Sequence, residues 1–325
     1  MRSGIVELPA FLYPSWPSMN NTPIQPGATF RRDGIFTALW IPADRDGRLL
    51  KQELQTLLAF QKKHGIHGIL ALGSTGEFLQ FDSAERKAIL AATAESAGSL
   101  PVIANISDIR PAVVRDLARS ARDLGLAGVA LLPPYFYPVA QPDLVEYLVR
   151  GAEAAQLPLL LYNFPERTGN RIALETVAAV AERVPVAAIK QSGDEFSYHA
   201  PLVQLGREKG FAVFTGADTR LAEAMALGAA GCIGGLVNAV PDLLVDIFQA
   251  AQAGHPERAA LSAARMKTLG ERLSSVMFPL NVGAAIEARG GPVGPPKMLI
   301  SAATDQAYCA LVQELKSLYR EWNLI

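Results

Sequence analysis

From residue 34 onward, short apolar runs alternate with longer segments in which apolar residues recur at helical spacing. This alternation predicts successive strand–helix units and a parallel sheet. In the first helical segment Leu50, Leu54 and Leu57 fall on one face. Asp82 followed by Glu85 predicts a capping box at the start of the second helix. The apolar runs predict strands at 34–41, 68–72, 101–105, 128–132, 158–162, 184–190, 211–215 and 231–235.

Eight such units indicate an α/β fold, a closed (β/α)8 TIM barrel whose active site lies where the strands end. A doubly wound sheet is the competing arrangement. It usually carries a glycine-rich dinucleotide loop after the first strand, but residues 41–44 read Ile-Pro-Ala-Asp. The barrel is therefore the better prediction.

The two ends of the chain differ from this repeat. Residues 1–33 are rich in Pro, Ser and Asn and are predicted to form an N-terminal extension. The catalytic barrel is expected over 34–254. The remaining residues, 255–325, are predicted to form a C-terminal helical appendage, interrupted by a Gly/Pro-rich loop at 290–296. Helical patterns at the end of the chain cover 242–253, 256–274, 279–289 and 304–322.

Composition narrows the possible partners. The 325 residues are 50% hydrophobic and carry a formal net charge of −1, so nothing favours a nucleic-acid partner. No apolar run is long enough to span a bilayer, and no membrane partner is expected. Cys232 and Cys309 are too few for a disulfide framework, which indicates a reducing, cytoplasmic setting. The four histidines show no metal-ligand spacing, so we expect neither a metal nor another cofactor.

Lys190 is the most informative single residue. It follows the apolar run 184–189 and precedes a polar segment, which places an amine at the C-terminal end of a buried strand. Apolar surroundings disfavour the charged ammonium and leave a neutral, nucleophilic amine, as Schiff-base chemistry on a carbonyl requires. The alternative is a lysine that reaches solvent or pairs with Asp194 or Glu195.

The second predicted strand also ends in polar residues. It is followed by Gly73-Ser74-Thr75-Gly76-Glu77, where glycines allow close approach of the backbone. Two adjacent hydroxyls and exposed N–H groups can hold a carboxylate. A capped turn that satisfies only its own backbone is the competing interpretation. The segment lacks the lysine of a phosphate-binding P-loop.

The fifth predicted strand ends in Tyr162, followed by Asn-Phe-Pro-Glu-Arg-Thr-Gly. A tyrosine hydroxyl near the Lys190 amine can move protons during imine formation. The alternative is an ordinary core tyrosine with a hydrogen-bonded hydroxyl. Arg167 can hold a second carboxylate bidentately, or it can pair with Glu166 at the surface.

Taken together, these motifs resemble the dihydrodipicolinate synthase/N-acetylneuraminate lyase family of class I, Schiff-base-forming lyases. The resemblance runs from residue 34 to roughly the C-terminus. It depends on GSTGE at 73–77, YNFPERTG at 162–169, IKQSGD at 189–194 and the glycine-rich ends of the last two strands. Each motif is weak singly, but their order and their placement on strands two, five and six are specific.

The resemblance implies a mechanism. Lys190 would attack the ketone of pyruvate or another 2-keto acid, and Tyr162 would shuttle protons. Ser74 and Thr75 would bind the keto-acid carboxylate and assist proton transfer. The iminium would then permit aldol addition, its reversal, or loss of water. The resemblance also implies a homo-oligomer, typically a tetramer. The expected substrate-binding residues are Gly73, Asn105, Tyr137, Arg167, Gly216, Ile233 and Gly234.

Two positions depart from the synthases of this family. Phe136 occupies the place of the second of two paired tyrosines, and Tyr137 is its expected substitute at a shifted position. Asn105 stands where the family commonly has glycine. These departures favour an aldolase or dehydratase for 2-keto-3-deoxy sugar acids, whereas Arg167 is compatible with both that group and the 4-hydroxy-tetrahydrodipicolinate synthases.

Two further readings stay open. One is a barrel aldolase for phosphorylated sugars, with Gly216 and 231–235 as the phosphate site, but only Arg220 supplies a basic residue there. The other is a non-catalytic regulator that binds a keto acid. Retention of Lys190 beside the other motif residues argues against it, since binding alone needs no imine-forming amine.

Overall fold

The computed structural model describes residues 29–325. Its centre is a closed barrel in which eight parallel strands follow one another in chain order. This confirms the predicted (β/α)8 fold. The predicted extension at 1–33 lies mostly outside the described residues. The strands are β1 (Gly34–Ala38), β2 (Gly68–Ala71), β3 (Val102–Asn105), β4 (Gly128–Leu131), β5 (Leu159–Asn163), β6 (Val186–Gln191), β7 (Ala212–Thr215) and β8 (Gly231–Gly234).

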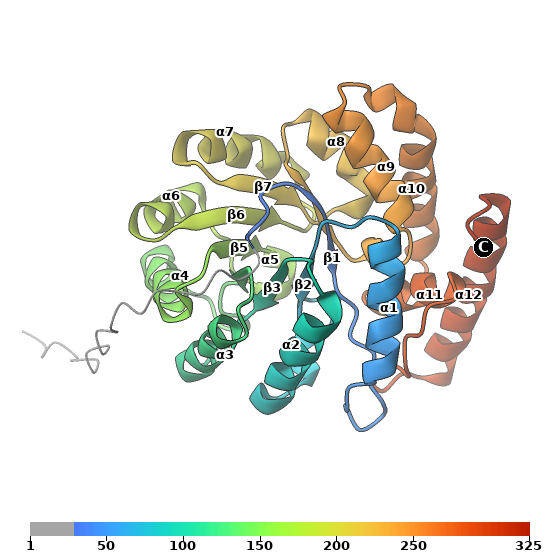
Figure 1. Cartoon of the computed structure of the whole chain (residues 1–325), viewed down its shortest axis with the longest axis horizontal. Coiled ribbons are helices and arrows are strands. Elements are labelled where there is room, and N and C mark those ends of the chain that lie inside the picture. Colours follow the sequence, from blue (N-terminus) through green and yellow to red (C-terminus); the bar gives the residue numbers. More distant parts are fainter. Residues whose placement is uncertain (1–28) are drawn as a thin grey trace, which may run out of the picture.

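Helices surround this barrel, as Figure 1 shows. They are α1 (Lys51–Lys63), α2 (Ser83–Ala97), α3 (Pro111–Asp123), α4 (Gln141–Ala155), α5 (Pro165–Thr168), α6 (Leu174–Arg183), α7 (His199–Lys209), α8 (Leu221–Ala226) and α9 (Pro241–Gln252). The 3-10 turns η1 (Phe78–Gln80), η2 (Phe196–Tyr198), η3 (Asp218–Arg220) and η4 (Leu236–Asn238) lie between strands and helices. None of the helices in residues 29–325 is both long and apolar enough to cross a membrane.

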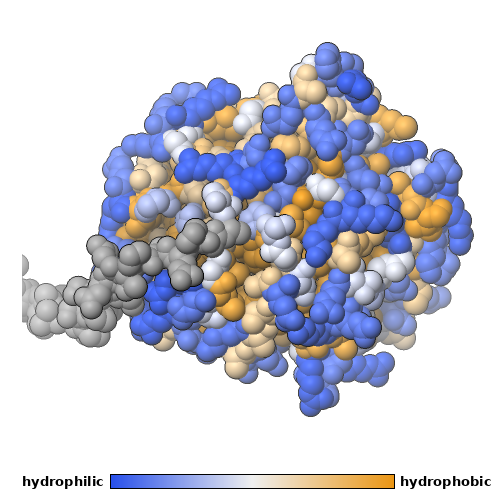
Figure 2. All heavy atoms as spheres, viewed as in Figure 1, coloured by the Kyte–Doolittle hydropathy of each residue, from blue (hydrophilic) through white to orange (hydrophobic). Residues whose placement is uncertain are grey.

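The C-terminal helices gather on one side of the barrel, near α1 and α9 (Figure 1). They comprise η5 (Pro256–Ala259), α10 (Ala260–Leu273), α11 (Leu280–Ala288) and α12 (Ala302–Glu321). Leu315 and Tyr319 of α12 are fully buried, so this helix packs firmly on its neighbours. Figure 2 shows one face of the molecule, where hydrophilic residues predominate and hydrophobic areas are scattered between them.

Local sequence explains these elements. The strands other than β7 are buried at every position, as their apolar composition requires for a parallel sheet covered by helices. The capping box that opens α2 is confirmed. The Glu85 N–H donates to the Asp82 side chain at 2.8 Å, and the Asp82 N–H donates to Glu85 Oε2 at 2.7 Å.

Gly231 is required where β8 meets β1. Its φ is +148°, and a Cβ there would lie 1.9 Å from the carbonyl oxygen of Gly34. We expect Gly231→Ala to lower the free energy of unfolding by about 3 kcal/mol or more, because the clash involves backbone. Gly210→Ala is the matched control, since it also has a positive φ (+79°) but open space around it, and should cost only about 1–2 kcal/mol. Denaturant unfolding measures both, and equal losses would contradict the steric account.

Candidate active site

Lys190 lies inside the barrel on β6 and is only 4% exposed. Its cross-strand partner on β5 is Tyr162, so the two side chains leave adjacent strands at the same level. The side-chain nitrogen Nζ lies 3.1 Å from the Tyr162 hydroxyl oxygen and 4.2 Å from the centre of the tyrosine ring. Among residues 29–325, Lys190 forms no ion pair, and Glu195 pairs with Arg171 instead. The surface-lysine interpretation is therefore wrong.

Tyr162 also connects Lys190 to the loop after β2. Its hydroxyl lies 3.3 Å from Ser74 Oγ, and either oxygen can be the donor. Lys190, Tyr162 and Ser74 thus form a continuous chain of hydrogen-bonding atoms from three different strand ends. Such a chain can carry a proton to and from a group that reacts with the amine.

Lys190 and Tyr162 open into a cavity of about 630 Å³ at the C-terminal end of the barrel, whereas Ser74 is not among the residues that line it. Thr75, Gly216 and Arg167 line it together with Lys190 and Tyr162. At Gly216, a Cβ would lie 1.9 Å from Ser192 Oγ and 2.9 Å from Lys190 Cε. A glycine is therefore needed there for the lysine side chain to take its observed position.

Arg167 also lines the cavity. Its guanidinium lies 5.8 Å and 5.1 Å from the ring centres of Phe164 and Phe278. Within residues 29–325, no carboxylate pairs with it. Glu166, the surface partner considered from sequence, instead accepts a hydrogen bond from the Asp194 N–H at 2.8 Å. The donors of Arg167 are thus available to an anionic ligand.

Asp218 is a cavity residue that sequence reasoning missed. It opens η3 after β7, and its carboxylate accepts hydrogen bonds from the N–H groups of Gly235 and Leu236, both at 3.2 Å. Burial raises the pKa of Asp218 to about 6, although Lys190 and these N–H groups oppose the shift. Burial likewise raises the pKa of the neighbouring Cys232 thiol well above its usual range.

The raised pKa predicts a characteristic pH dependence of stability. Between about pH 4 and pH 6 the unfolded chain has already lost the Asp218 proton while the folded protein retains it. Stability therefore falls as the pH rises through this window. We expect Asp218→Asn to remove this part of the decline while adding a pH-independent cost for the altered hydrogen bonds. Unfolding free energies of both proteins, measured from pH 4 to 7, provide the test. A constant difference across that range would contradict the assignment.

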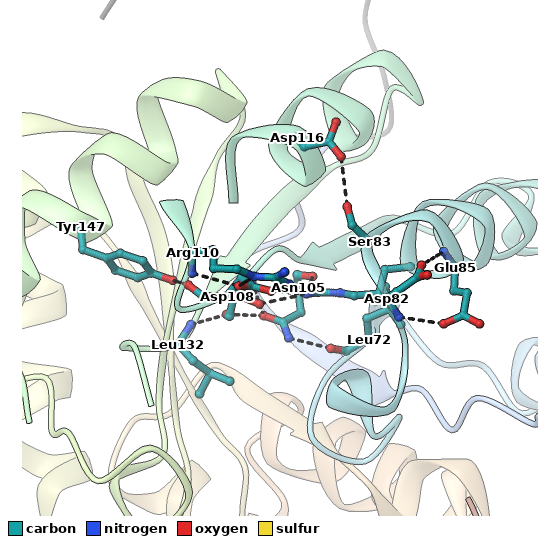
Figure 3. Close-up of polar contacts among 12 residues, drawn as sticks. Leu72, Asp82, Ser83, Glu85, Asn105, Asp108, Arg110, Asp116, Leu132 and Tyr147 are labelled. Carbon is teal, nitrogen blue, oxygen red and sulfur yellow. Dashed lines mark hydrogen bonds and ion pairs between the residues drawn. The ribbon is translucent and has the colours of Figure 1, made fainter. Parts of the chain in front are cut away.

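Some residues proposed from sequence stand elsewhere. Asn105 is fully buried, and its Nδ2 donates to the carbonyl oxygen of Leu72 at 2.6 Å (Figure 3). Tyr137 is 65% exposed and packs edge-on against Phe136. Neither lines the cavity, and Gly73 and Ile233 do not line it either. These four residues are not brought to the cavity surface in this single chain.

Gly234 contacts the cavity residue Asp218. A Cβ at this position would lie 1.7 Å from Asp218 Oδ1, so the glycine makes room for that carboxylate. Gly234 itself is not among the residues that line the cavity. The glycine-rich end of β8 was visible in the sequence, but its partner Asp218, which follows the neighbouring strand β7, was not.

The C-terminal region supplies a further part of the wall that sequence reasoning missed. Gly270 and Leu273 of α10, Phe278 before α11, and Asn281 and Val282 of α11 all line the cavity. Asn281 Nδ2 donates to the Leu273 carbonyl at 3.2 Å, whereas its Oδ1 has no partner among the described residues. No sequence motif marks these residues. Within residues 29–325, no group of three or more His, Cys, Asp or Glu side chains is suited to a metal ion.

Comparisons with known proteins show the family of this chain. The sequence model of the dihydrodipicolinate synthetase family matches residues 31–318. A 4-hydroxy-tetrahydrodipicolinate synthase from Exiguobacterium sp. is 30% identical over 284 residues, which cover 87% of this chain and 97% of the relative.

Solved structures are similar as well. YagE, a prophage protein of E. coli K12 crystallised with pyruvate, is 26% identical with a TM-score of 0.80, over 87% of this chain and 98% of that one. A sialic acid aldolase from Ruminococcus gnavus gives a TM-score of 0.79 over 89% and 99% of the two chains. At 22% identity, the aldolase supports the fold alone.

Proposed function

This chain belongs to the dihydrodipicolinate synthetase family, and from that membership we propose that Lys190 is its Schiff-base lysine and pyruvate its first substrate. The protein is a lyase of the class I, Schiff-base-forming type. The observation that carries the proposal is the buried contact between Lys190 Nζ and the Tyr162 hydroxyl, which continues to Ser74.

In the proposed reaction, the neutral amine of Lys190 adds to the ketone carbon of pyruvate. The resulting carbinolamine loses water, with Tyr162 passing a proton to the departing oxygen, and leaves an iminium. Ser74 and Thr75 hold the pyruvate carboxylate. Tyr162, which has given up its proton, then takes a proton from C3, and the resulting enamine carbon attacks an aldehyde. The same steps in reverse cleave the carbon–carbon bond.

We assign the second substrate to the part of the cavity beside Arg167. Pyruvate fills only a fraction of the roughly 630 Å³, which leaves space for a larger partner. The unpaired guanidinium of Arg167 supports a second substrate that carries a carboxylate, such as aspartate semialdehyde. Thr219, Ser274 and Asn281 also line the cavity and can bind hydroxyls, which supports a 2-keto-3-deoxy sugar acid as the alternative substrate.

The other two readings receive less support. A phosphate site near the last strands would need a free cation, but Arg220 pairs with Glu223 and stacks on Phe196 at 3.5 Å from the ring centre. A purely regulatory role would not explain why the Lys190 amine is buried beside the Tyr162 hydroxyl, because binding alone needs no imine-forming amine. We therefore retain the enzyme as the proposal.

We also propose a homo-oligomer, with a tetramer as the expected form, in the cytoplasm. Phe136 and Tyr137 are 84% and 65% exposed on the loop after β4, which supports a contact between copies there. Cys232 and Cys309 are both free, which is compatible with a reducing compartment.

Borohydride trapping tests the proposed function. The protein is incubated with pyruvate, reduced with borohydride, and mapped by peptide mass spectrometry. We expect a pyruvate-derived adduct on Lys190 that is absent from Lys190→Ala. Lys209→Ala is the control, because Lys209 lies at the surface in an ion pair with Glu182 and should not affect trapping. A folded protein with no adduct from pyruvate or any other 2-keto acid would overturn the proposal.

A further inference from the structure

The loop that carries Ser74 and Thr75 is bounded by two residues in an unusual backbone conformation. Leu72 has φ +58° and Glu77 has φ +53°, both in the left-handed region. Each such residue other than glycine costs about 1–2 kcal/mol and persists only where its surroundings impose it. Between them, turns join the Gly76 N–H to the Gly73 carbonyl and the Glu77 N–H to the Ser74 carbonyl, both at 3.1 Å.

Side chains from elsewhere in the fold hold both ends of this loop. At the first end, the Asn105 side chain on β3 donates to the Leu72 carbonyl at 2.6 Å (Figure 3). The Ser107 hydroxyl in turn donates to Asn105 Oδ1 at 2.5 Å. Arg86 braces the same network, since its guanidinium donates to the carbonyls of Asn105 and Ser107 at 3.0 and 3.1 Å. This end is therefore tied to the barrel wall.

At the second end, Glu77 is tied to the C-terminal region. Lys297 Nζ lies 2.8 Å from Glu77 Oε1, and the two side chains are only 3% and 9% exposed. The same ammonium lies 4.3 Å from the ring centre of Trp40, which in turn donates from Nε1 to the Val293 carbonyl at 2.9 Å. Burial lowers the pKa of Lys297 even though Glu77 opposes the shift. Retention of a charge in such a place needs the close partner.

Glu77, the carboxylate partner of Lys297, is two residues after Thr75 in the sequence. Thr75 lines that cavity, and its Oγ1 lies within 3.0 Å of where a Cβ of Gly235 would be. Gly76 is equally confined, because a Cβ there would lie 2.8 Å from the Leu39 carbonyl. Any movement of Glu77 is thus transmitted along a short, tightly packed segment to the Thr75 hydroxyl.

We propose that Lys297 is a positioning residue, which holds the Thr75 hydroxyl in reacting position through Glu77. This role rests on the proposed function, since it acts on the loop that is taken to bind the pyruvate carboxylate. It also gives the C-terminal region a part in the chemistry, although Lys297 itself touches no substrate.

The test uses two readouts that need no second substrate. One is the rate of borohydride trapping by pyruvate, and the other is exchange of the pyruvate C3 protons for deuterium, followed by NMR well below the Tm of each variant. We expect Lys297→Met to lower exchange at saturating pyruvate by about 10- to 100-fold, as small misplacements do. Lys297→Arg keeps a cation beside Glu77 and should recover most of the rate.

A matched control separates positioning from stability. Lys51 pairs with Glu95 at the same 2.8 Å, but both side chains are exposed, at 53% and 63%, and Lys51→Met should leave exchange unchanged. In a Thr75→Val background, where the hydroxyl is absent, Lys297→Met should change the rate by less than about 2-fold. Wild-type exchange in Lys297→Met with a lowered Tm, or fully additive effects with Thr75→Val, would overturn the proposal.

Lys297→Met leaves a buried, unpaired carboxylate and can fail to fold. The double variant Glu77→Gln/Lys297→Met removes both charges and is expected to fold with the same loss of exchange. Wild-type exchange in that variant would equally overturn the proposal. Absence of trapping in the wild-type protein defeats the proposed function itself, whereas trapping at equal rates in wild type and variants defeats only the role of Lys297.

Discussion

Replacing Lys190 with arginine is expected to lower the rate of pyruvate C3 exchange by at least about 10³-fold, the scale at which loss of a covalent nucleophile acts. Arginine keeps a long, basic side chain at this position, but its guanidinium stays protonated and cannot form the imine. Deuterium exchange measured by NMR at saturating pyruvate gives the rate. The substitution therefore removes the imine-forming amine but keeps a large side chain in the same place.

Two controls separate loss of the amine from a loss of stability. The Tm of Lys190→Arg should fall only modestly, because Tyr162 remains beside the new side chain and the barrel core is unaltered. Lys209→Arg, which changes an exposed lysine at the end of α7, should exchange at the wild-type rate. Exchange in Lys190→Arg within about 10-fold of wild type would mean that another group forms the imine or that exchange needs none.

The barrel was predictable because the strands are mostly apolar and buried, and alternation with helices leaves few topologies. The strand ends were less predictable, because residues beyond a strand can stay buried although they no longer form hydrogen bonds to a neighbouring strand. Leu39, Trp40 and Ile41 remain buried beyond the end of β1. The Trp40 N–H, however, donates to Asn238 Oδ1 at 3.0 Å and not to a neighbouring strand. An apolar pattern records the burial but not this change of partner.

Some residues of the candidate site could also be predicted from the sequence, and others could not. Lys190 and Tyr162 follow apolar runs, so counting along parallel strands places both at one end of the barrel. Asp218 and Asn281 carry no such signal, because each depends on a turn or helix that reaches the cavity only in the folded chain. Asn105 was expected at the substrate, yet its amide is used up in holding Leu72. A polar residue at a strand end can serve the fold as well as the ligand.

Tyr162→Phe is expected to lower pyruvate C3 exchange by about 10²- to 10⁴-fold, the usual contribution of a positioned acid–base group. The substitution keeps the ring over Lys190 Nζ but removes the hydroxyl that lies 3.1 Å from Nζ and 3.3 Å from Ser74 Oγ. Imine formation then lacks its proton carrier, whereas the lysine nucleophile remains. Prolonged incubation with pyruvate and borohydride should therefore still label Lys190, only more slowly.

This combination of slow labelling and slow exchange distinguishes a proton carrier from a structural tyrosine. A tyrosine that only fills the core would give wild-type rates after loss of its hydroxyl, with at most a small change in Tm. Tyr198→Phe is the matched control, because the Tyr198 hydroxyl is also buried and donates to the Ile172 carbonyl at 2.8 Å, outside the set of residues that line the cavity. It should cost about 1 kcal/mol of stability and leave exchange unaltered. Equal losses of rate in the two variants would assign the Tyr162 hydroxyl to packing, and would leave Ser74 and Thr75 as the groups that move the proton.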